Sequence, residues 1–433
     1  MSQDLLDRLL AGTLPDPDGA GLLSVPVRRV VIAPTLAGRE AELVRSLGLG
    51  PRLAIVSDPA TRRALGERVV AALSSGGPTE EVVLGEAPHA DDGTVAAIRA
   101  KAKDADALVA VGSGSINDLC KYAAFQDAKP YAVFGTAPSM NGYTSMSAAI
   151  TEHGHKKSLP ARPPLGVFLD LGVLAAAPAR MIRSGLGDSA CRPTAEADWL
   201  LAHLLFDQPY RRAPFVLLRQ DEETLLADAS RLMAGDLSAM EILARTLVLS
   251  GLGMTLCGGS YPASQGEHLI SHYIDMRGDP AWPASFHGEH IAVTTLTMAR
   301  IQEAMLAGPA PSIAPSRIGP ADFERHYGRE LGASCWAAFA NKALNPDAAA
   351  AHQGRLARDW PEIRRRIGAV ARASADIEKA LLDAGAPTRP ADIHVPKDFY
   401  REAVLHAREI RDRYGFLDLA ADSGRLRALA AMA

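Results

Sequence analysis

The chain lacks the features that mark several classes of protein. Its 433 residues include only four cysteines, widely spaced and without a C-x-x-C pair, so the sequence contains no disulfide framework. The formal net charge is −4 and 22% of residues are charged, which gives no electrostatic reason to expect binding to nucleic acid or to an anionic membrane. No run of about 18 apolar residues is present, so no membrane-spanning helix is expected.

The beginning of the chain also lacks a secretory pattern. The stretch M-S-Q-D-L-L-D-R-L-L is acidic and amphipathic, whereas a signal peptide has a basic start and an apolar core. Together with the cysteine usage, this predicts a cytoplasmic protein. The sequence shows no internal repeat, and 48% hydrophobic residues over this length can form one large core or two domains.

Short apolar segments alternate with helical patterns in the first part of the chain. We predict strands at 30–32, 53–56, 81–84, 107–111, 131–134 and 167–170, and helices at 39–47, 61–73 and 119–125. Strands that alternate with helices form a parallel sheet with helices on both faces, and ligands bind at the carboxyl ends of its strands. The Pro-rich stretch 160–164 is predicted to link this α/β domain, residues 1–165, to a mainly helical domain, residues 166–433.

The turn after the fourth predicted strand reads Gly112-Ser113-Gly114-Ser115-Ile116. Small residues let the backbone approach an anion, and the N-terminus of the following helix offers unpaired N–H groups, so the turn can cradle a pyrophosphate. It is not the G-x-G-x-x-G fingerprint of the ordinary dinucleotide-binding unit. A plain tight turn explains the same residues equally well.

Two other strand ends carry polar residues. Asp58 can accept hydrogen bonds from an adenosine ribose, although capping the next helix is an equally economical role. The loop at 135–145, G-T-A-P-S-M-N-G-Y-T-S, carries many hydroxyls, as loops that bind polar ligands do. Lys156 and Lys157 can face a phosphate, but the tip of a solvated hairpin explains them as well.

Four of the twelve histidines lie close together, at positions 268, 272, 287 and 290. His268 and His272 are four residues apart in an apolar helical pattern, so both rings lie on one helix face. His287 follows after a gap that a helix, a turn and the next helix can close. Such imidazoles can share a metal ion if a carboxylate converges on them. A single histidine on an apolar helix is nevertheless more often a hydrogen-bonded core residue.

The acidic ligand must come from elsewhere, because the stretch offers only Glu267, Asp275 and Glu289. Asp188 follows a G-x-G turn and precedes an apolar helix. It can be the N-cap of that helix, the commonest role for an aspartate there. It can also be the anionic ligand that completes an Asp/His/His set.

Several segments resemble a known family in sequence and in order: V-G-S-G-S-I-N-D-L-C-K (111–121), T-A-P-S-M-N-G-Y-T-S (136–145), S-G-L-G-D (184–188), Y-P-A-S-Q-G-E-H-L-I-S-H (261–272) and F-H-G-E (286–289). They are similar to those of sn-glycerol-1-phosphate dehydrogenases, and the chain looks like the bacterial branch. That family lies within the superfamily of dehydroquinate synthases, glycerol dehydrogenases and iron-containing alcohol dehydrogenases. The resemblance implies a Rossmann-like parallel-sheet domain followed by a helical metal-binding domain.

The resemblance also implies roles for individual residues. Asp188, His268 and His287 would bind one divalent metal ion, zinc or nickel, with iron as a further option. His272 would contact the substrate and is the candidate proton relay, alongside a metal-bound water. The expected contacts of the cofactor, NAD(H) or NADP(H), are Gly112, Ser113, Gly114, Ser115, Ile116, Thr136, Ser139 and Ser145.

Three positions depart from the family pattern. Asn141 stands where the family usually has an aspartate that touches the substrate, and an amide cannot take a proton or bind a hydroxyl with the same charge-assisted strength. Ser113 replaces a glycine of the usual triple-glycine turn, and Gln265-Gly266 alters the usual Ser-Gly step before Glu267. These changes bear on the identity of the substrate rather than on the cofactor fold.

The expected function is reduction of dihydroxyacetone phosphate to sn-glycerol 1-phosphate, or a close analogue of this reaction, by a homo-oligomer, a dimer, that binds neither nucleic acid nor membrane. The carboxylate of Asp58 favours NADH, because it would repel a 2′-phosphate. The alternatives are a dehydrogenase of an unphosphorylated polyol, a cyclase like dehydroquinate synthase, and a nucleotide-binding sensor that has lost catalysis.

Overall fold

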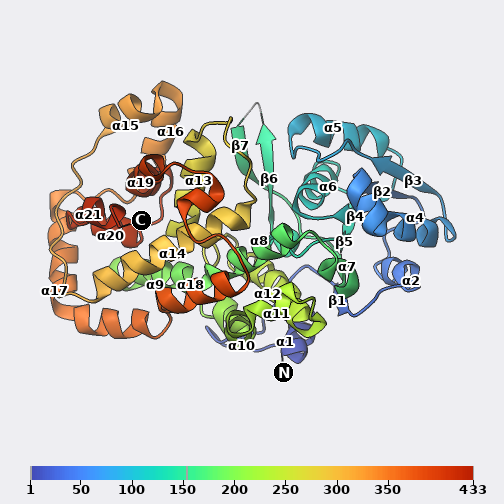
Figure 1. Cartoon of the computed structure of the whole chain (residues 1–433), viewed down its shortest axis with the longest axis horizontal. Helices are drawn as coiled ribbons and strands as arrows, with labels where there is room; N and C mark the ends of the chain where they lie inside the picture. Colours follow the sequence, from blue (N-terminus) through green and yellow to red (C-terminus); the bar gives the residue numbers. More distant parts are fainter. Residues whose placement is uncertain (1, 153–154, 433) are drawn as a thin grey trace. The chain divides into compact units, whose positions relative to one another are not determined.

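The computed structural model describes residues 2–152 and 155–432 and divides into two compact units (Figure 1). Unit 1 comprises Met1–Ser189 and Arg212–Ser260, and unit 2 comprises Ala190–Arg211 and Tyr261–Ala433. The chain therefore passes between the units three times, whereas the predicted domains 1–165 and 166–433 are each continuous. The difference arises because a group of three helices that follows residue 211 returns to unit 1.

Unit 1 is built on a six-stranded sheet in the order β1-β8-β5-β4-β2-β3, in which every pair of neighbours is parallel. Four of its strands are buried along their whole length, as expected for parallel strands covered on both faces. All six predicted strands are confirmed. The strands are β1 (Arg29–Ala33), β2 (Leu53–Ser57), β3 (Thr79–Val83), β4 (Ala107–Gly112), β5 (Tyr131–Gly135) and β8 (Gly166–Asp170).

The direction in which the sheet grows reverses at β2. The next strand in sequence, β3, pairs on one side of β2, and β4 pairs on the other. The carboxyl ends of β2 and β4 therefore form the topological switch point at which open α/β sheets bind ligands. Asp58 directly follows β2, and Gly112 ends β4.

Helices cover both faces of this sheet. Leu43 of α2 and Val69 of α4 belong to the same buried cluster as Ile55 and Val109, which point to one face, and Figure 1 shows α5 and α6 on the opposite side. The helices and turns of unit 1 are α1 (Ser2–Leu10), α2 (Glu40–Arg45), α3 (Pro59–Thr61), the π-helical turn η1 (Arg62–Gly66), α4 (Glu67–Ser74), α5 (Asp92–Lys101), α6 (Gly114–Gln126), the 3₁₀ turn η2 (Gly142–Thr144), α7 (Leu171–Ala175), α8 (Ala179–Ala190), α10 (Ala213–Ala227), α11 (Ala229–Met233) and α12 (Leu237–Leu256).

Residues 160–164 do not link two domains. They connect an antiparallel hairpin, β6 (Ser147–Glu152) and β7 (His155–Pro160), to β8, which pairs with β1 and β5 in the sheet of unit 1. Lys157 lies on this hairpin and donates to Glu152 Oε2 at 3.2 Å, with 47% of its side chain exposed. This supports the solvated-hairpin interpretation, while the side chain of Lys156 lies outside the described residues.

Among the described residues, α12 is the one helix long and apolar enough to cross a membrane by length and composition, with a mean hydropathy of 1.3. Of its apolar window, 78% is buried within the structure. This burial is typical of the core helix of a globular unit.

Unit 2 is helical. Its core gathers apolar side chains from α9 to the C-terminal helices, among them Tyr273, Trp360 and Phe416. Its helices and turns are α9 (Arg192–Phe206), α13 (Gly266–Arg277), α14 (His287–Leu306), α15 (Pro320–Tyr327), α16 (Arg329–Phe339), α17 (Pro346–Gly368), α18 (Ser374–Asp383), the 3₁₀ turn η3 (Pro390–Ile393), α19 (Lys397–His406), the 3₁₀ turn η4 (Ala407–Ile410), α20 (Phe416–Asp422) and α21 (Leu426–Ala430).

Four charged side chains are buried together in unit 2. Asp418 accepts hydrogen bonds from Lys342 Nζ at 2.9 Å and from Arg408 Nη1 at 3.3 Å. Burial, and then the charge of Asp418, raise the pKa of the neighbouring Asp422 to about 7, and burial lowers the pKa of Lys342. Because each charge depends on its partners for stabilisation, removing one of them should be costly.

We expect Lys342→Met to lower the free energy of unfolding by about 3–5 kcal/mol, because it leaves Asp418 buried without its closest cation. Urea denaturation at pH 8 measures the change. The matched control is Lys379→Met, whose ion pair with Asp383 involves a lysine that is 73% exposed, and its cost should stay below about 1 kcal/mol. Equal losses in the two variants would show that the buried cluster contributes no more than a surface pair.

Candidate functional site

The loop at 136–145 is held between two helices of unit 1. On one side, Ser184 Oγ of α8 donates to Ser139 O at 3.0 Å, and Asp188 Oδ2 accepts from Asn141 N at 2.8 Å. On the other, Thr144 Oγ1 donates to a carbonyl of α12, Val248 O, at 2.8 Å. Two side chains of α8 are therefore hydrogen-bonded to the backbone of the loop.

Two glycines permit this arrangement. A Cβ at Gly185 would lie 1.7 Å from Pro138 O, and one at Gly251 would lie 2.2 Å from Thr144 Oγ1. Real Cβ atoms do not approach other atoms so closely, so each helix can reach the loop only where it has no side chain. The first glycine of the G-x-G pattern, Gly185, and the glycine at 251 therefore serve close helix–loop packing.

A buried lysine fixes the far end of the same loop. Lys121 of α6 is fully buried, and its Nζ donates to Gly142 O at 2.6 Å, to Ser147 O at 2.9 Å and to Ser145 Oγ at 3.1 Å. Burial lowers the pKa of Lys121, while Asp118 opposes this shift. The sequence analysis missed this residue, although a lysine within the apolar stretch L-C-K-Y-A-A was a detectable signal. The Ser145 hydroxyl therefore serves the loop, and its contact with a cofactor stays a prediction.

The predicted pyrophosphate turn lies at the switch point of the sheet. Gly112 ends β4, and a Cβ there would lie 2.5 Å from Ile116 Cβ, so only glycine fits. Gly114 opens α6, whose first N–H groups come directly after the strand. Thr136 N donates to Gly112 O at 3.1 Å, which joins the ends of β4 and β5. The geometry is that of a strand followed at once by a helix N-terminus, which suits an anion.

Asp58 has the capping role that the sequence analysis left open. Its Oδ1 accepts from Ala60 N at 2.9 Å and from Thr61 N at 2.8 Å, and Thr61 Oγ1 accepts from Asp58 N. This is a complete capping box at the start of α3. The capping role does not exclude a contact with a ribose, because the carboxyl end of β2 is where the ribose of a dinucleotide is expected. That contact stays a prediction.

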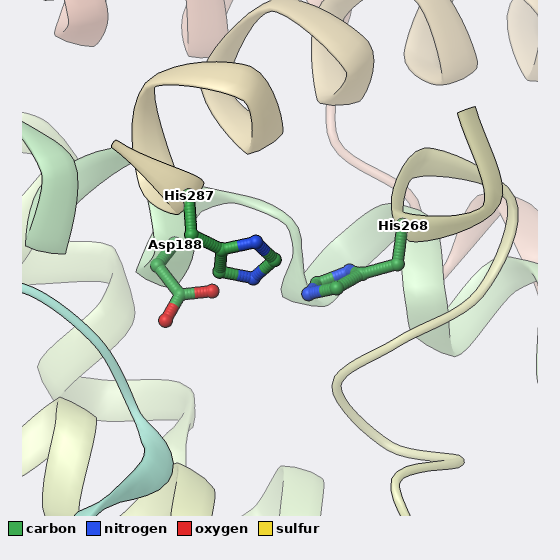
Figure 2. Close-up of side chains that lie close together, drawn as sticks. All are labelled: Asp188, His268 and His287. Carbon is green, nitrogen blue, oxygen red and sulfur yellow. The ribbon is translucent and has the colours of Figure 1, made fainter. Parts of the chain in front are cut away.

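The predicted metal ligands form one group. Asp188 lies in the last turn of α8, His268 in the first turn of α13, and His287 at the first residue of α14. One ligand atom from each lies within 4.8 Å of the other two, and Figure 2 shows both rings and the carboxylate gathered together. The separation is close to that of ligands sharing one ion, whose bonds are about 2.0–2.2 Å long.

The N-cap interpretation of Asp188 is wrong. Helix α8 continues through Ala190, so the G-x-G residues are themselves helical and Asp188 lies within the last turn of the helix. The aspartate is 1% exposed and His268 is 5% exposed. A buried carboxylate beside two imidazoles is the donor set expected for a zinc-like divalent ion.

The remaining candidates around the histidines divide into two kinds. His272 is half-buried, and its ring centroid lies 5.9 Å from that of His268 and 6.4 Å from that of His287, so it borders the group. His290 Nδ1 instead lies 3.6 Å from Asp275 Oδ1. Glu289 Oε2 accepts from the backbone N–H of Phe286 at the start of α14, which is a structural role.

The comparisons with known proteins agree with this architecture. Residues 31–178 match the family model of iron-containing alcohol dehydrogenases. The solved structure of a probable glycerol dehydrogenase from Sinorhizobium meliloti superposes with a TM-score of 0.61, at 20% identity, over 94% of this chain and 97% of that chain. The fold and the matching family model are those of the iron-containing alcohol dehydrogenases, and the Asp/His/His group is a donor set that suits a divalent metal ion.

Relatives with assigned names identify the family within this class. The glycerol-1-phosphate dehydrogenase [NAD(P)+] of Bacillus licheniformis is 29% identical over 385 residues, which cover 87% of this chain and 84% of the relative. The enzyme of the same name from Pyrococcus abyssi is 31% identical over 297 residues, 66% of this chain and 84% of the relative. The chain belongs to the glycerol-1-phosphate dehydrogenase family, which confirms the resemblance seen in its motifs.

We expect Gly185→Ala to destabilise the protein by about 3 kcal/mol, because the new methyl group would overlap the Pro138 carbonyl and force α8 away from the loop. Thermal unfolding and zinc content after dialysis measure the two consequences, since Asp188 moves with α8. Gly354→Ala is the control: this glycine of α17 is exposed and has nothing within 4 Å of its added Cβ. The control should gain about 0.5–1 kcal/mol from helix propensity. A neutral Gly185→Ala would mean that the close approach is not needed.

Proposed function

We propose that this protein reduces dihydroxyacetone phosphate to sn-glycerol 1-phosphate with NADH or NADPH and one divalent metal ion. The names of its relatives suggest the reaction. The observation that carries the proposal is the group formed by Asp188, His268 and His287, whose ligand atoms lie within 4.8 Å of one another. A carboxylate and two imidazoles suit zinc or nickel, and they also accept iron.

The three residues would hold the ion, and a bound divalent ion supplies Lewis-acid polarisation of the substrate carbonyl. The backbone N–H of Asn141 orients Asp188 through its 2.8 Å hydrogen bond to Oδ2. His272 borders the group at half-burial, where it can give a proton to the alkoxide oxygen as the carbonyl is reduced. The nicotinamide supplies the hydride.

The cofactor contacts follow from the sheet. The turn from Gly112 to Ile116 would bind the pyrophosphate at the N-terminus of α6. Thr136 and Ser139, which are buried in the 136–145 loop, would contact the rest of the cofactor. Asn141 Nδ2 donates to Ser250 Oγ at 3.3 Å. Its amide is thereby anchored to α12 beside Asp188, where the family's aspartate would touch the substrate.

The remaining predictions belong to the same proposal. The substrate is a small phosphorylated ketone or polyol, the enzyme is a homodimer in the cytoplasm, and neither nucleic acid nor a membrane takes part. An unphosphorylated polyol is the second candidate substrate class. Asn141 bears on the choice, because it stands where the family usually places an aspartate that touches the substrate.

The first test is NADH oxidation by zinc-loaded enzyme with dihydroxyacetone phosphate and with dihydroxyacetone. We expect turnover with the phosphate, and a loss of kcat/KM of about 10³-fold or more in Asp188→Ala and His268→Ala, because each removes a ligand. Chelation with EDTA should abolish turnover, and zinc or nickel should restore it. His290→Gln is the control and should keep both activity and bound metal, since that ring faces Asp275.

Two results would contradict this proposal in different ways. Equal or better turnover of dihydroxyacetone would assign the enzyme to unphosphorylated polyols. No turnover of either ketone by an enzyme that binds both metal and NADH would point to a different substrate or to the cyclase reaction.

The second test concerns the cofactor. Asp58→Asn should keep the cap of α3, because asparagine and aspartate cap helices equally well, while it removes the negative charge. We expect the KM for NADPH to fall about 5-fold or more, equivalent to about 1 kcal/mol, with little change for NADH. Asp91→Asn, at the N-cap of α5, is the matched control and should leave the ratio of the two KM values unchanged. An unchanged ratio in Asp58→Asn would reduce this residue to a helix cap.

A further inference from the structure

A second carboxylate lies behind His268. Glu267 is fully buried, and its Oε1 lies 2.9 Å from His268 Nδ1. Because an ionised carboxylate can only accept a hydrogen bond, the proton at this contact resides on Nδ1. The other ring nitrogen, Nε2, then carries the lone pair that a metal ligand needs.

Glu267 is held in place by its own neighbours. Its Oε1 also accepts from Gln265 N at 2.8 Å, and the Thr194 hydroxyl lies 3.4 Å from Oε2. The sulfur of Cys191 completes a buried group in which one atom each of Cys191, Glu267 and His268 lies within 4.8 Å of the others. These contacts hold the carboxylate beside the imidazole.

A third carboxylate fixes the turn that carries this pair. Asp198 of α9 is 1% exposed, and its Oδ2 accepts from Gly266 N at 3.0 Å. Its Oδ1 accepts from Phe416 N at 3.0 Å and from Gln302 Nε2 at 3.1 Å. Gly266 and Phe416 are the first residues of α13 and α20, so one side chain holds the N-termini of two helices.

The close approach of Asp198 also explains the glycine before Glu267. A Cβ at Gly266 would lie 2.8 Å from Asp198 Oδ2 and 2.5 Å from Met298 Cε. Burial, and then the charge of Glu267, raise the pKa of Asp198 to about 7. Two buried carboxyl groups thus lie close enough to influence each other, one beside His268 Nδ1 and one at the turn that carries this histidine.

We propose that Glu267 is a positioning residue that fixes the tautomer and the orientation of His268, with Asp198 fixing the helix turn from which both project. The inference rests on the proposed function only in assigning a metal ion to His268. Carboxylate partners of this kind orient a ligating imidazole and raise its basicity, and their loss typically costs about 10–100-fold in metal affinity.

A purely structural role makes a different prediction. Glu267 lies in the first turn of α13, where any carboxylate stabilises the helix through its N-terminal N–H groups. If that were its whole role, replacing it would lower stability and leave the tautomer of His268 and its metal affinity unchanged.

The test compares Glu267→Gln with wild type without measuring turnover. Affinity for Co²⁺ and Zn²⁺ is measured on metal-free protein by competition with a chromophoric chelator, and we expect it to fall about 10–100-fold. The tautomer of His268 is read from its ¹⁵N shifts in metal-free protein, assigned with His268→Gln. Wild type should show the Nδ1–H form, and Glu267→Gln should show a mixture, because a glutamine amide can donate as well as accept.

Asp322→Asn is the matched control, because Asp322 is a first-turn carboxylate of α15 that accepts from Gly319 N at 2.9 Å. It should lose stability without any change in metal affinity. The positioning role is overturned if Glu267→Gln keeps the wild-type tautomer and affinity and merely loses stability as Asp322→Asn does.

Failure of the proposed function gives a separate signature. In that case His268→Ala would bind metal as wild type does, or wild type would bind none. The Nδ1–H tautomer of wild type and its loss in Glu267→Gln would still decide the positioning role.

Discussion

The close contact between the backbone of Gly185 and the carbonyl of Pro138 is the constraint that positions Asp188 and the 136–145 loop in unit 1. A helix can come this close to a loop only at a residue without a side chain. Once it does, the residues on either side, Ser184 and Asp188, are within hydrogen-bonding reach of the loop. The predicted metal ligand, Asp188, is therefore positioned by helix–loop packing, and the loop that follows β5 is hydrogen-bonded to the helix that carries it.

Much of the sheet could be predicted from the sequence because its strands are short apolar runs between helical patterns, and burial on both faces leaves that signal intact. The helix boundaries were less accessible. Helix α6 begins at Gly114 rather than at 119, since a glycine- and serine-rich start resembles a loop even when it is the first helical turn. The return of α10–α12 to unit 1 depends on contacts far apart in sequence, which no local pattern records.

The candidate site shows the same division. The two histidines and Asp188 were predicted as a set, yet the local pattern around Asp188 suggested a cap because G-x-G usually interrupts a helix. Lys121 and Asp198 were missed because their roles depend on hydrogen-bond partners that are distant in sequence. Asp198, for example, accepts a hydrogen bond from Phe416 N, 218 positions away. Sequence reveals which side chains can bind a metal, whereas the groups that orient them appear only once the chain is folded.

The shared cap formed by Asp198 also bears on how unit 2 folds. Its two backbone partners, Gly266 and Phe416, lie 68 and 218 positions further along the chain. Contacts between residues so far apart in sequence require long stretches of chain to be closed into loops, which costs conformational entropy. The turn that carries Glu267 and His268 is therefore a product of the assembled unit, because α13 by itself lacks the side chain that caps it.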